Sequence, residues 1–391
     1  MEFRRVSSLP PYVFAVTEQL KLELRRAGED VIDLGFGNPD LPSPTAAVEK
    51  LTEAAAKPRN HRYSASRGIP KLRAAICDLY ADRFGVELDP ETQAVATIGA
   101  KEGLAHLMWV LVEPGDVAVV PTPSYPIHLQ APVLAGATVL TVELGGHDDE
   151  VYDRFAAACA QTPPRAIVVS FPHNPTTRVV ELSLLERLVG LAREHEALLV
   201  HDFAYADISF DGYHPPSVLQ VAGAEEVAVE IYSLTKSFSM AGWRVGFALG
   251  NAPALAALAR LKSYLDYGTF QPIQIASIVA LNEAREYSAE VCAIYRSRRD
   301  ALCSGLARIG WPVEPPRGTM FVWAPIPEPY RNSGSLEFAL RLLREARVSV
   351  SPGVGFGAGG EGHVRFALVE NEQRIRQAVR GIRKALPELD A

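Results

Sequence analysis

The feature that most restricts the fold of this chain is the alternation of short apolar segments with stretches of helical periodicity. The apolar segments lie at residues 94–98, 117–120, 138–142, 166–170, 197–201, 227–232 and 245–249. Strands that alternate with helices form βαβ units, which assemble into a mainly parallel sheet. In such sheets, ligands bind at the carboxyl ends of the strands. The sequence therefore predicts an α/β fold with a site at one edge of the sheet.

Polar residues follow the apolar segment 227–232, and they include Ser233, Thr235, Lys236 and Arg244. A lysine just past the end of a buried strand projects into a cleft, where a desolvated amine forms a Schiff base with an aldehyde cofactor. The hydroxyl groups and the guanidinium beside it suit a phosphate. This combination indicates a site for pyridoxal 5'-phosphate (PLP), with Lys236 as the nucleophile. A surface lysine in a loop is the alternative for this segment taken alone.

Two further polar clusters follow other apolar segments. Asp202 comes directly after residues 197–201, and a carboxylate at the end of a buried strand needs a positive partner, such as a protonated pyridine nitrogen. Tyr205 and Asn174 are placed to donate hydrogen bonds to the ring oxygen of the same cofactor. The alternatives are a helix N-cap or an arginine ion pair for Asp202, and a simple turn at Asn174.

Taken together and in this order, these motifs resemble the class I/II aminotransferases, which are fold type I PLP-dependent enzymes. Lys236 follows Ser233 by three positions and Arg244 follows Lys236 by eight, as in that family. The similarity runs from residues 9–14 to residues 364–367, and the connecting phrases 35–40, 63–70, 97–108 and 123–128 look like the branch of the bacterial glutamate-pyruvate (alanine) aminotransferases and the LL-diaminopimelate aminotransferases. The resemblance implies a large domain with a mainly parallel sheet flanked by helices, plus a smaller α/β domain.

The phosphate end of the expected site includes Gly99, Ala100 and Lys101, which follow a strand and open a helix. Their backbone N–H groups would lie at a helix N-terminus, which favours anions. The family commonly has serine at position 100, so alanine there puts one hydroxyl contact in doubt. The resemblance also implies that Tyr125 stacks on the cofactor ring and that Tyr63 reaches the phosphate of a neighbouring subunit, in a homodimer with shared active sites. Either tyrosine can instead be a core residue with a polar tip.

Arg365 is the expected substrate-binding residue. It lies on an apolar strand, where a guanidinium needs an anionic partner, and the α-carboxylate of an amino acid can supply it through a two-point contact. The carboxylate-binding arginine of the family falls on Arg365, with Asn174, the Gly37 backbone N–H and Tyr12 beside it. The alternatives are an ion pair of Arg365 with Glu370 and a packing contact for Tyr12.

These parts predict an aminotransferase that moves an amino group between an L-amino acid and a 2-oxo acid by a ping-pong mechanism. Lys236 would move the proton, Asp202 would keep the ring nitrogen protonated, and Tyr205 would assist. We expect alanine and 2-oxoglutarate, giving pyruvate and glutamate. The alternatives are another amino acid (LL-diaminopimelate, aromatic or methionine) or a PLP-dependent C–S lyase. The glycine-rich segment 353–358 imitates a dinucleotide loop without the strand and helix that such a loop needs, so we interpret it as a turn.

Composition excludes several other classes. The 391 residues are 48% hydrophobic and 22% charged, which suffices for a large core. A net charge of −7 offers no basic field for nucleic acid. No segment has the length or pattern of a membrane span or signal peptide, so we expect a cytoplasmic enzyme of small molecules. The four scattered cysteines predict small buried hydrophobic side chains or free thiols, and no histidine or cysteine spacing predicts a metal site.

Domain boundaries are the least marked feature of the sequence. Helical periodicity predicts a helix at 13–27 closed by Gly28, and a long helix at 283–309. We expect an N-terminal arm with part of the small domain (1–40), a large PLP-binding domain (41–285) and a small C-terminal domain (286–391) that ends with a strand at 364–368 and a helix at 372–385. Side-chain specificity is left open, with His173 and residues 264–269 as the first positions to inspect.

Overall fold

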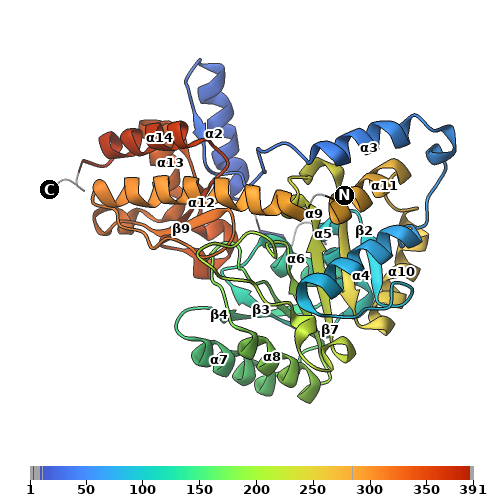
Figure 1. Ribbon diagram of the computed structural model, residues 1–391. Helices are drawn as coiled ribbons and strands as arrows, with labels where there is room; N and C mark the ends of the chain where they lie inside the picture. The colour runs from blue at the N-terminus through green and yellow to red at the C-terminus, as the bar shows by residue number, and fades with distance from the viewer. Residues whose placement is uncertain (1–2, 4–8, 11, 284, 388–391) are drawn as a thin grey trace.

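The computed structural model describes residue 3 and residues 9–10, 12–283 and 285–387 (Figure 1). Its largest sheet has seven strands, in the order β2 (Ala94–Thr97), β8 (Gly246–Gly250), β7 (Ala228–Ser233), β6 (Leu198–Asp202), β5 (Ala166–Val169), β3 (Val117–Thr122) and β4 (Thr138–Glu143). The pairs from β7 to β4 are parallel, while β8 is antiparallel to both β7 and β2. The predicted α/β fold is confirmed, and each predicted strand lies within a residue or two of its expected place.

The antiparallel direction of β8 follows from the connection before it. Parallel neighbours need a long crossover, usually a full helix. Between β7 and β8 the chain forms only α9 (Leu234–Ser237) and a 3-10 turn at Ala241–Trp243. This short connection keeps Lys236 at the end of β7 and returns the chain alongside the same strand.

Helices cover both faces of the sheet, because its strands are apolar on both faces. In β5, Ala166 and Val168 belong to the core cluster with α5, α6 and α10, whereas Ile167 and Val169 belong to the cluster with α4, α7, α8 and α11. This is the alternation expected of a strand buried on both sides. The helices are α3 (Thr45–Ala55), α4 (Pro70–Phe84), α5 (Ala100–Leu111), α6 (Pro126–Ala135), α7 (Asp148–Gln161), α8 (Leu182–Glu194), α10 (Ala252–Leu265) and α11 (Gln271–Glu283).

The C-terminal part has its own core and its own small sheets. One is an antiparallel sheet of β11 (Ser351–Pro352), β12 (His363–Ala367) and β9 (Phe321–Pro325), and the other pairs β1 (Ile32–Asp33) with β10 (Val348–Ser349). Helices α13 (Ser335–Arg341) and α14 (Glu372–Ala385) complete this part. Figure 1 shows α12 (Arg285–Arg308) running from it towards the large sheet. Since β1 joins the N-terminal segment to this part, we propose the division at residues 40 and 285 for the two domains.

The predicted helices at 13–27 and 372–385 are present as α2 (Phe14–Arg26) and α14. Gly28 follows α2 with a φ of +84°, which suits glycine at a helix end. The helix predicted at 283–309 is α12, but Glu283 ends α11 instead, and residue 284 lies outside the described residues. Residues Gly353–Phe356 form a 3-10 turn, as interpreted from the sequence. Within the described ranges, no helix is both long enough and apolar enough to cross a membrane.

Candidate active site

A cavity of about 410 Å³ lies where the strands of the large sheet end and the C-terminal part meets them. Strand ends bring together side chains that are far apart in the sequence, because parallel strands end at the same edge. The predicted residues that line this cavity are Tyr12, Gly37, Ala100, Lys101, Tyr125, Asn174, Asp202, Tyr205, Ser233, Thr235, Lys236, Arg244 and Arg365. The other two, Gly99 and Tyr63, are described below.

Lys236 lies on α9 with its ammonium group inside the cavity. Its Nζ donates a hydrogen bond to the carbonyl oxygen of Gly37 at 2.7 Å. Burial, together with the nearby charges of Arg365 and Arg244, lowers the pKa of Lys236 from 10.5 to about 7. A lysine in this state is a neutral amine in an appreciable fraction of molecules near neutral pH, which is the form that attacks a carbonyl group.

Asp202 is the buried carboxylate at the end of β6, but its partner differs from both alternatives drawn from the sequence. Its Oδ2 lies 2.8 Å from Nε2 of His128, and the Nδ1 of that ring lies 2.9 Å from Oγ of Ser124. Its Oδ1 accepts a hydrogen bond from the backbone N–H of Ala204. His128 was not predicted from the sequence as a site residue, although it lies in the phrase 123–128 that carried part of the resemblance. The contact holds Asp202 in place and leaves it facing the cavity.

Arg365 is buried on β12, between the rings of Phe321 and Phe356, whose centroids lie 3.9 and 4.7 Å from its guanidinium carbon. Its NH1 donates to Oδ1 of Asn174 at 2.7 Å, and its NH2 donates to the carbonyl of Gly35 at 3.1 Å. Within the described residues, none of its hydrogen bonds or ion pairs joins a carboxylate, so the alternative partner Glu370 is not observed. Burial lowers the pKa of Arg365 from 12.5 to about 10. A buried guanidinium without a counter-ion fits an anionic ligand.

The Asn174 contact also orients its amide. Because Oδ1 accepts from Arg365, the Nδ2 group is left as the donor, which agrees with the predicted hydrogen bond to a ring oxygen. Tyr205 lies on the same side, with its ring centroid 5.9 Å from Nζ of Lys236. Burial raises the pKa of Tyr205, so its phenol stays protonated and is a donor.

The opposite end of the cavity is built for an anion. Gly99 precedes α5 with a φ of +79°, and a Cβ atom added there would lie 2.3 Å from NH2 of Arg244. Glycine is therefore required for the guanidinium to reach the helix N-terminus. Ser233 caps α9, because its Oγ accepts a hydrogen bond from the backbone N–H of Thr235 at 3.2 Å, and both residues line the cavity. These groups and the N-terminus of α5 fit a phosphate.

Four predicted residues lie in surroundings that the sequence did not indicate. Gly37 uses its carbonyl oxygen to bind Lys236, and a Cβ there would lie 2.6 Å from Phe321. Tyr12 is 64% exposed, while Tyr125 is half-buried and desolvation raises its pKa. Tyr63 is 84% exposed and packs on Tyr267 with ring centroids 4.6 Å apart, outside the cavity of its own chain.

The positions singled out for specificity lie in two different surroundings. His173 is buried, is not among the residues that line the cavity, and has its pKa lowered by burial to about 3. Residues 264–269 lie at the surface beside Tyr63, where Tyr264 is 82% exposed.

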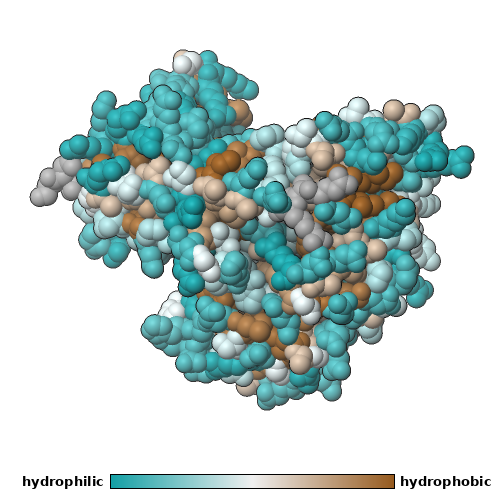
Figure 2. Space-filling model, in the orientation of Figure 1, coloured by the Kyte–Doolittle hydropathy of each residue, from teal (hydrophilic) through white to brown (hydrophobic). Residues whose placement is uncertain are grey.

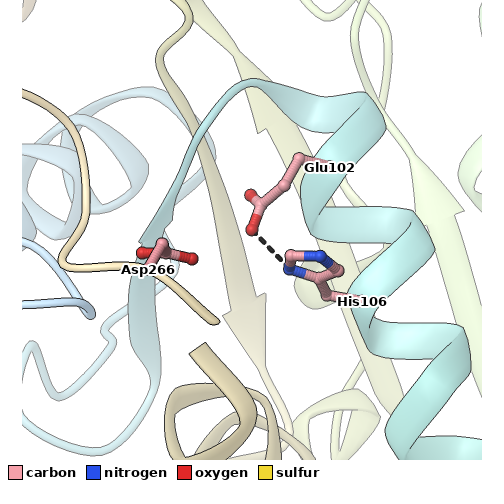
Figure 3. Close-up of side chains that lie close together, drawn as sticks. All are labelled: Glu102, His106 and Asp266. Atoms are coloured by element: carbon pink, nitrogen blue, oxygen red, sulfur yellow. Dashed lines mark ion pairs between the residues drawn. The ribbon is translucent and has the colours of Figure 1, made fainter. Parts of the chain in front are cut away.

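A second group of ionisable side chains lies at the first turns of α5. Figure 3 shows Glu102 and His106 on that helix, facing Asp266. One ring nitrogen of His106 and one carboxylate oxygen each of Glu102 and Asp266, the atoms that could bind a metal ion, lie within 4.8 Å of one another. The buried Lys262 already supplies a positive charge there, with Nζ 2.9 Å from Oε1 of Glu102 and 3.0 Å from Oδ2 of Asp266. The group is therefore an ion-pair network, and we propose no metal site from it.

The fold and the cavity define the class of protein. A desolvated lysine, a buried carboxylate at a strand end, and an anion site at a helix N-terminus together fit PLP, and the separate buried arginine fits a carboxylate substrate. The chain belongs to the aminotransferase class I and II family, whose profile matches residues 29–382. It is a PLP-dependent aminotransferase with the α/β fold of the fold type I enzymes.

Individual relatives span almost the whole chain. It is 53% identical over 382 residues to glutamate-pyruvate aminotransferase AlaC of Escherichia coli, covering 97% of this chain and 93% of that protein. It is 44% identical over 388 residues to the LL-diaminopimelate aminotransferase of Desulforudis audaxviator, covering 99% and 98%. Among solved structures, a double mutant of Thermus thermophilus aspartate aminotransferase superposes with a TM-score of 0.91 at 30% identity, covering 99% of this chain and all of that one. The substrate-bound BacF of Bacillus subtilis superposes with a TM-score of 0.90 at 34% identity, covering 98% and 97%.

Proposed function

We propose that this aminotransferase moves the amino group of L-alanine to 2-oxoglutarate, giving pyruvate and glutamate in two successive half-reactions. The observation that carries the substrate class is the buried guanidinium of Arg365, which shares a cavity with Lys236 and lacks a carboxylate partner among the described residues. The carboxylate of an amino acid or a 2-oxo acid supplies that charge. The choice of alanine and glutamate is supported by the 53% identity to the Escherichia coli glutamate-pyruvate enzyme.

The side chains divide the work within the cavity. When bound, PLP supplies an electron-withdrawing ring next to the reacting carbon. Arg365 binds and orients the substrate carboxylate, and Lys236 takes and returns the proton at Cα through its Nζ. Asp202, held by His128, stabilises a proton on the ring nitrogen. The hydroxyls of Ser233 and Thr235, Arg244 and the N-terminus of α5 hold the phosphate, while Asn174 and Tyr205 donate to the ring oxygen.

Turnover with defined substrates tests this assignment. Purified protein with PLP is expected to form glutamate from 2-oxoglutarate only when alanine is present. Failure to use alanine while another amino acid donates would remove the alanine assignment and keep the transaminase. Release of a thiol, pyruvate and ammonia from an S-substituted cysteine, without an amino acceptor, would instead identify a C–S lyase.

LL-diaminopimelate is a second candidate donor, because the outer part of the cavity carries charges of both signs. Lys21 there lies 2.5 Å from Oδ2 of Asp33 and 2.6 Å from Oε2 of Glu18, and all three line the cavity. The second amino and carboxylate groups of LL-diaminopimelate can form ion pairs with these side chains in place of the ion pairs that the side chains make with one another. Parallel half-reactions with alanine and LL-diaminopimelate, followed by the cofactor absorbance, decide between the two.

We also propose that the enzyme is a homodimer with shared active sites. Large hydrophobic side chains are exposed along one segment, at Tyr264, Leu265, Tyr267 and Phe270, and the exposed ring of Tyr63 packs on Tyr267. On the face shown in Figure 2, hydrophobic colour gathers over the position of α11, which follows this segment. A second copy would cover the patch and bring Tyr63 to its phosphate site. The cytoplasmic location stays a prediction from the sequence.

A mixing experiment tests the shared site. Tyr63→Ala and Lys236→Met would each impair both sites of their own dimer. In a hybrid dimer, one of the two sites combines a wild-type Lys236 with a wild-type Tyr63. Equal mixing makes about half of the dimers hybrids, so subunit exchange is expected to restore about a quarter of the activity. No recovery in confirmed hybrids would show that each chain builds its own site.

A further inference from the structure

A buried carboxylate outside the cavity accepts hydrogen bonds from residues on both sides of Lys236 in the sequence. Asp207 follows Tyr205 by two residues, and its side chain is 1% exposed. The phenol of Tyr232 donates to its Oδ2 at 2.5 Å, and the hydroxyl of Ser237 donates to the same oxygen. Tyr232 and Ser237 are also within 3.3 Å of each other.

The two donors flank residues 233–236 in the sequence. Tyr232 comes just before Ser233, and Ser237 comes just after Lys236. Asp207 itself belongs to the segment that begins with Asp202 and includes Tyr205. One carboxylate oxygen therefore joins both ends of the lysine turn to the chain that carries the ring-binding residues. We propose that Asp207 is a positioning residue, which fixes Lys236 relative to Asp202 and Tyr205.

The charge of Asp207 is balanced away from the cavity. Arg83 of α4 forms an ion pair with its Oδ1 and donates to the carbonyl of Ala206 at 3.2 Å. Burial raises the pKa of Tyr232, so its phenol stays protonated as a donor. Neither Asp207 nor its partners Tyr232, Ser237 and Arg83 line the cavity, so they can influence the chemistry only through the residues that they hold.

Such a network affects position more than binding. Buried polar networks that are fully hydrogen-bonded hold their members in one geometry. A displacement of about 1 Å at a reacting group can lower a rate by about a hundredfold. Loss of one donor is therefore expected to move the amine of Lys236 within the cavity without removing any group that touches cofactor or substrate.

Two mild variants test the inference, Ser237→Ala and Tyr232→Phe. Each removes one hydroxyl and leaves Asp207 with its other donor and with Arg83, so the chain is expected to fold. Tyr80→Phe is the matched control. The Tyr80 phenol is equally buried and donates to Oε1 of another buried carboxylate, Glu230, at 2.7 Å. Its ring packs edge-on against that of Tyr232, with centroids 6.0 Å apart, and phenylalanine keeps this contact while removing only the hydroxyl.

The readout is the rate at which the cofactor-free enzyme captures PLP, followed by absorbance as a function of pH, with thermal unfolding in parallel. This rate depends on the neutral amine of Lys236, so its midpoint reports the environment of that group. We expect Ser237→Ala and Tyr232→Phe to raise the midpoint by about one pH unit and to slow capture about tenfold. Tyr80→Phe is expected to lower the melting temperature to a similar degree while keeping the wild-type midpoint and rate.

Wild-type midpoints in both variants, or an equal change in Tyr80→Phe, would overturn the positioning role. The inference rests on the proposed role of Lys236, which Lys236→Met tests separately. Capture that persists in Lys236→Met removes the role of the lysine itself. Capture that is lost there but unchanged in Ser237→Ala and Tyr232→Phe removes only the role of Asp207.

Discussion

Replacement of Lys236 by methionine tests the electrostatics of the site directly. Burial lowers the pKa of this lysine from 10.5 to about 7, with smaller contributions from Arg365 and Arg244. The folded protein therefore binds this proton more weakly than the unfolded chain does. Between pH 7 and 10.5 the unfolded chain carries more of the proton, so this group makes the free energy of unfolding rise with pH across that window.

The size of the effect follows from the two pKa values. A difference between 10.5 and about 7 corresponds to at most about 5 kcal/mol. The side chain is half-buried and lines an open cavity, so water reduces this to about 2 kcal/mol. Methionine removes the charge at similar length and also removes the hydrogen bond to Gly37, which costs about 1 kcal/mol at every pH. Below pH 7 the cofactor-free variant is thus expected to be more stable than the wild type by about 1 kcal/mol, and near pH 10.5 it should be less stable by about the same amount.

Thermal unfolding of the cofactor-free proteins across that pH range is the assay. Lys262→Met is the matched control, because Lys262 is also buried but lies between the carboxylates of Glu102 and Asp266. Its removal takes the ion-pair partner from Asp266 and leaves Glu102 with His106, which should destabilise the protein by about 3 kcal/mol. A constant difference between wild type and Lys236→Met at all pH values would refute the reasoning, and so would a stabilising Lys262→Met.

Three further variants test the cavity. Arg365→Gln removes the two-point carboxylate contact, and kcat/KM for the amino acid should fall about 10²–10³-fold, mainly through KM, in steady-state assays; an unchanged KM would place the carboxylate elsewhere. His128→Phe removes the partner of Asp202 and should weaken PLP binding about tenfold in equilibrium titrations, since the carboxylate loses its fixed orientation; wild-type affinity would make the contact incidental. Ala100→Ser restores a hydroxyl at the helix N-terminus and should tighten PLP binding about fivefold, and a weaker complex would show that the position has no room for it.

Much of the site was accessible from the sequence because it is local. A lysine between hydroxyls just after a strand, a carboxylate at the next strand end, and an Asn-Pro turn after a third are each short patterns, and strand ends meet in a parallel sheet. The strands could likewise be predicted, because a strand that is buried on both faces appears in the sequence as a continuous apolar run. Arg365 could be placed because a guanidinium on an apolar strand has few other uses.

Partners that come from distant segments could be found only in the tertiary structure. His128 reaches Asp202 from 74 positions away, and Asn174 meets Arg365 across 191 positions. The depressed pKa of Lys236 depends on burial among residues of both parts of the chain, and the carboxylate of Asp207 gains its meaning only from Tyr232 and Ser237 behind the lysine. Sequence patterns record the direction in which each side chain leaves its strand, whereas hydrogen-bond partners and desolvation are set by what other segments place beside it.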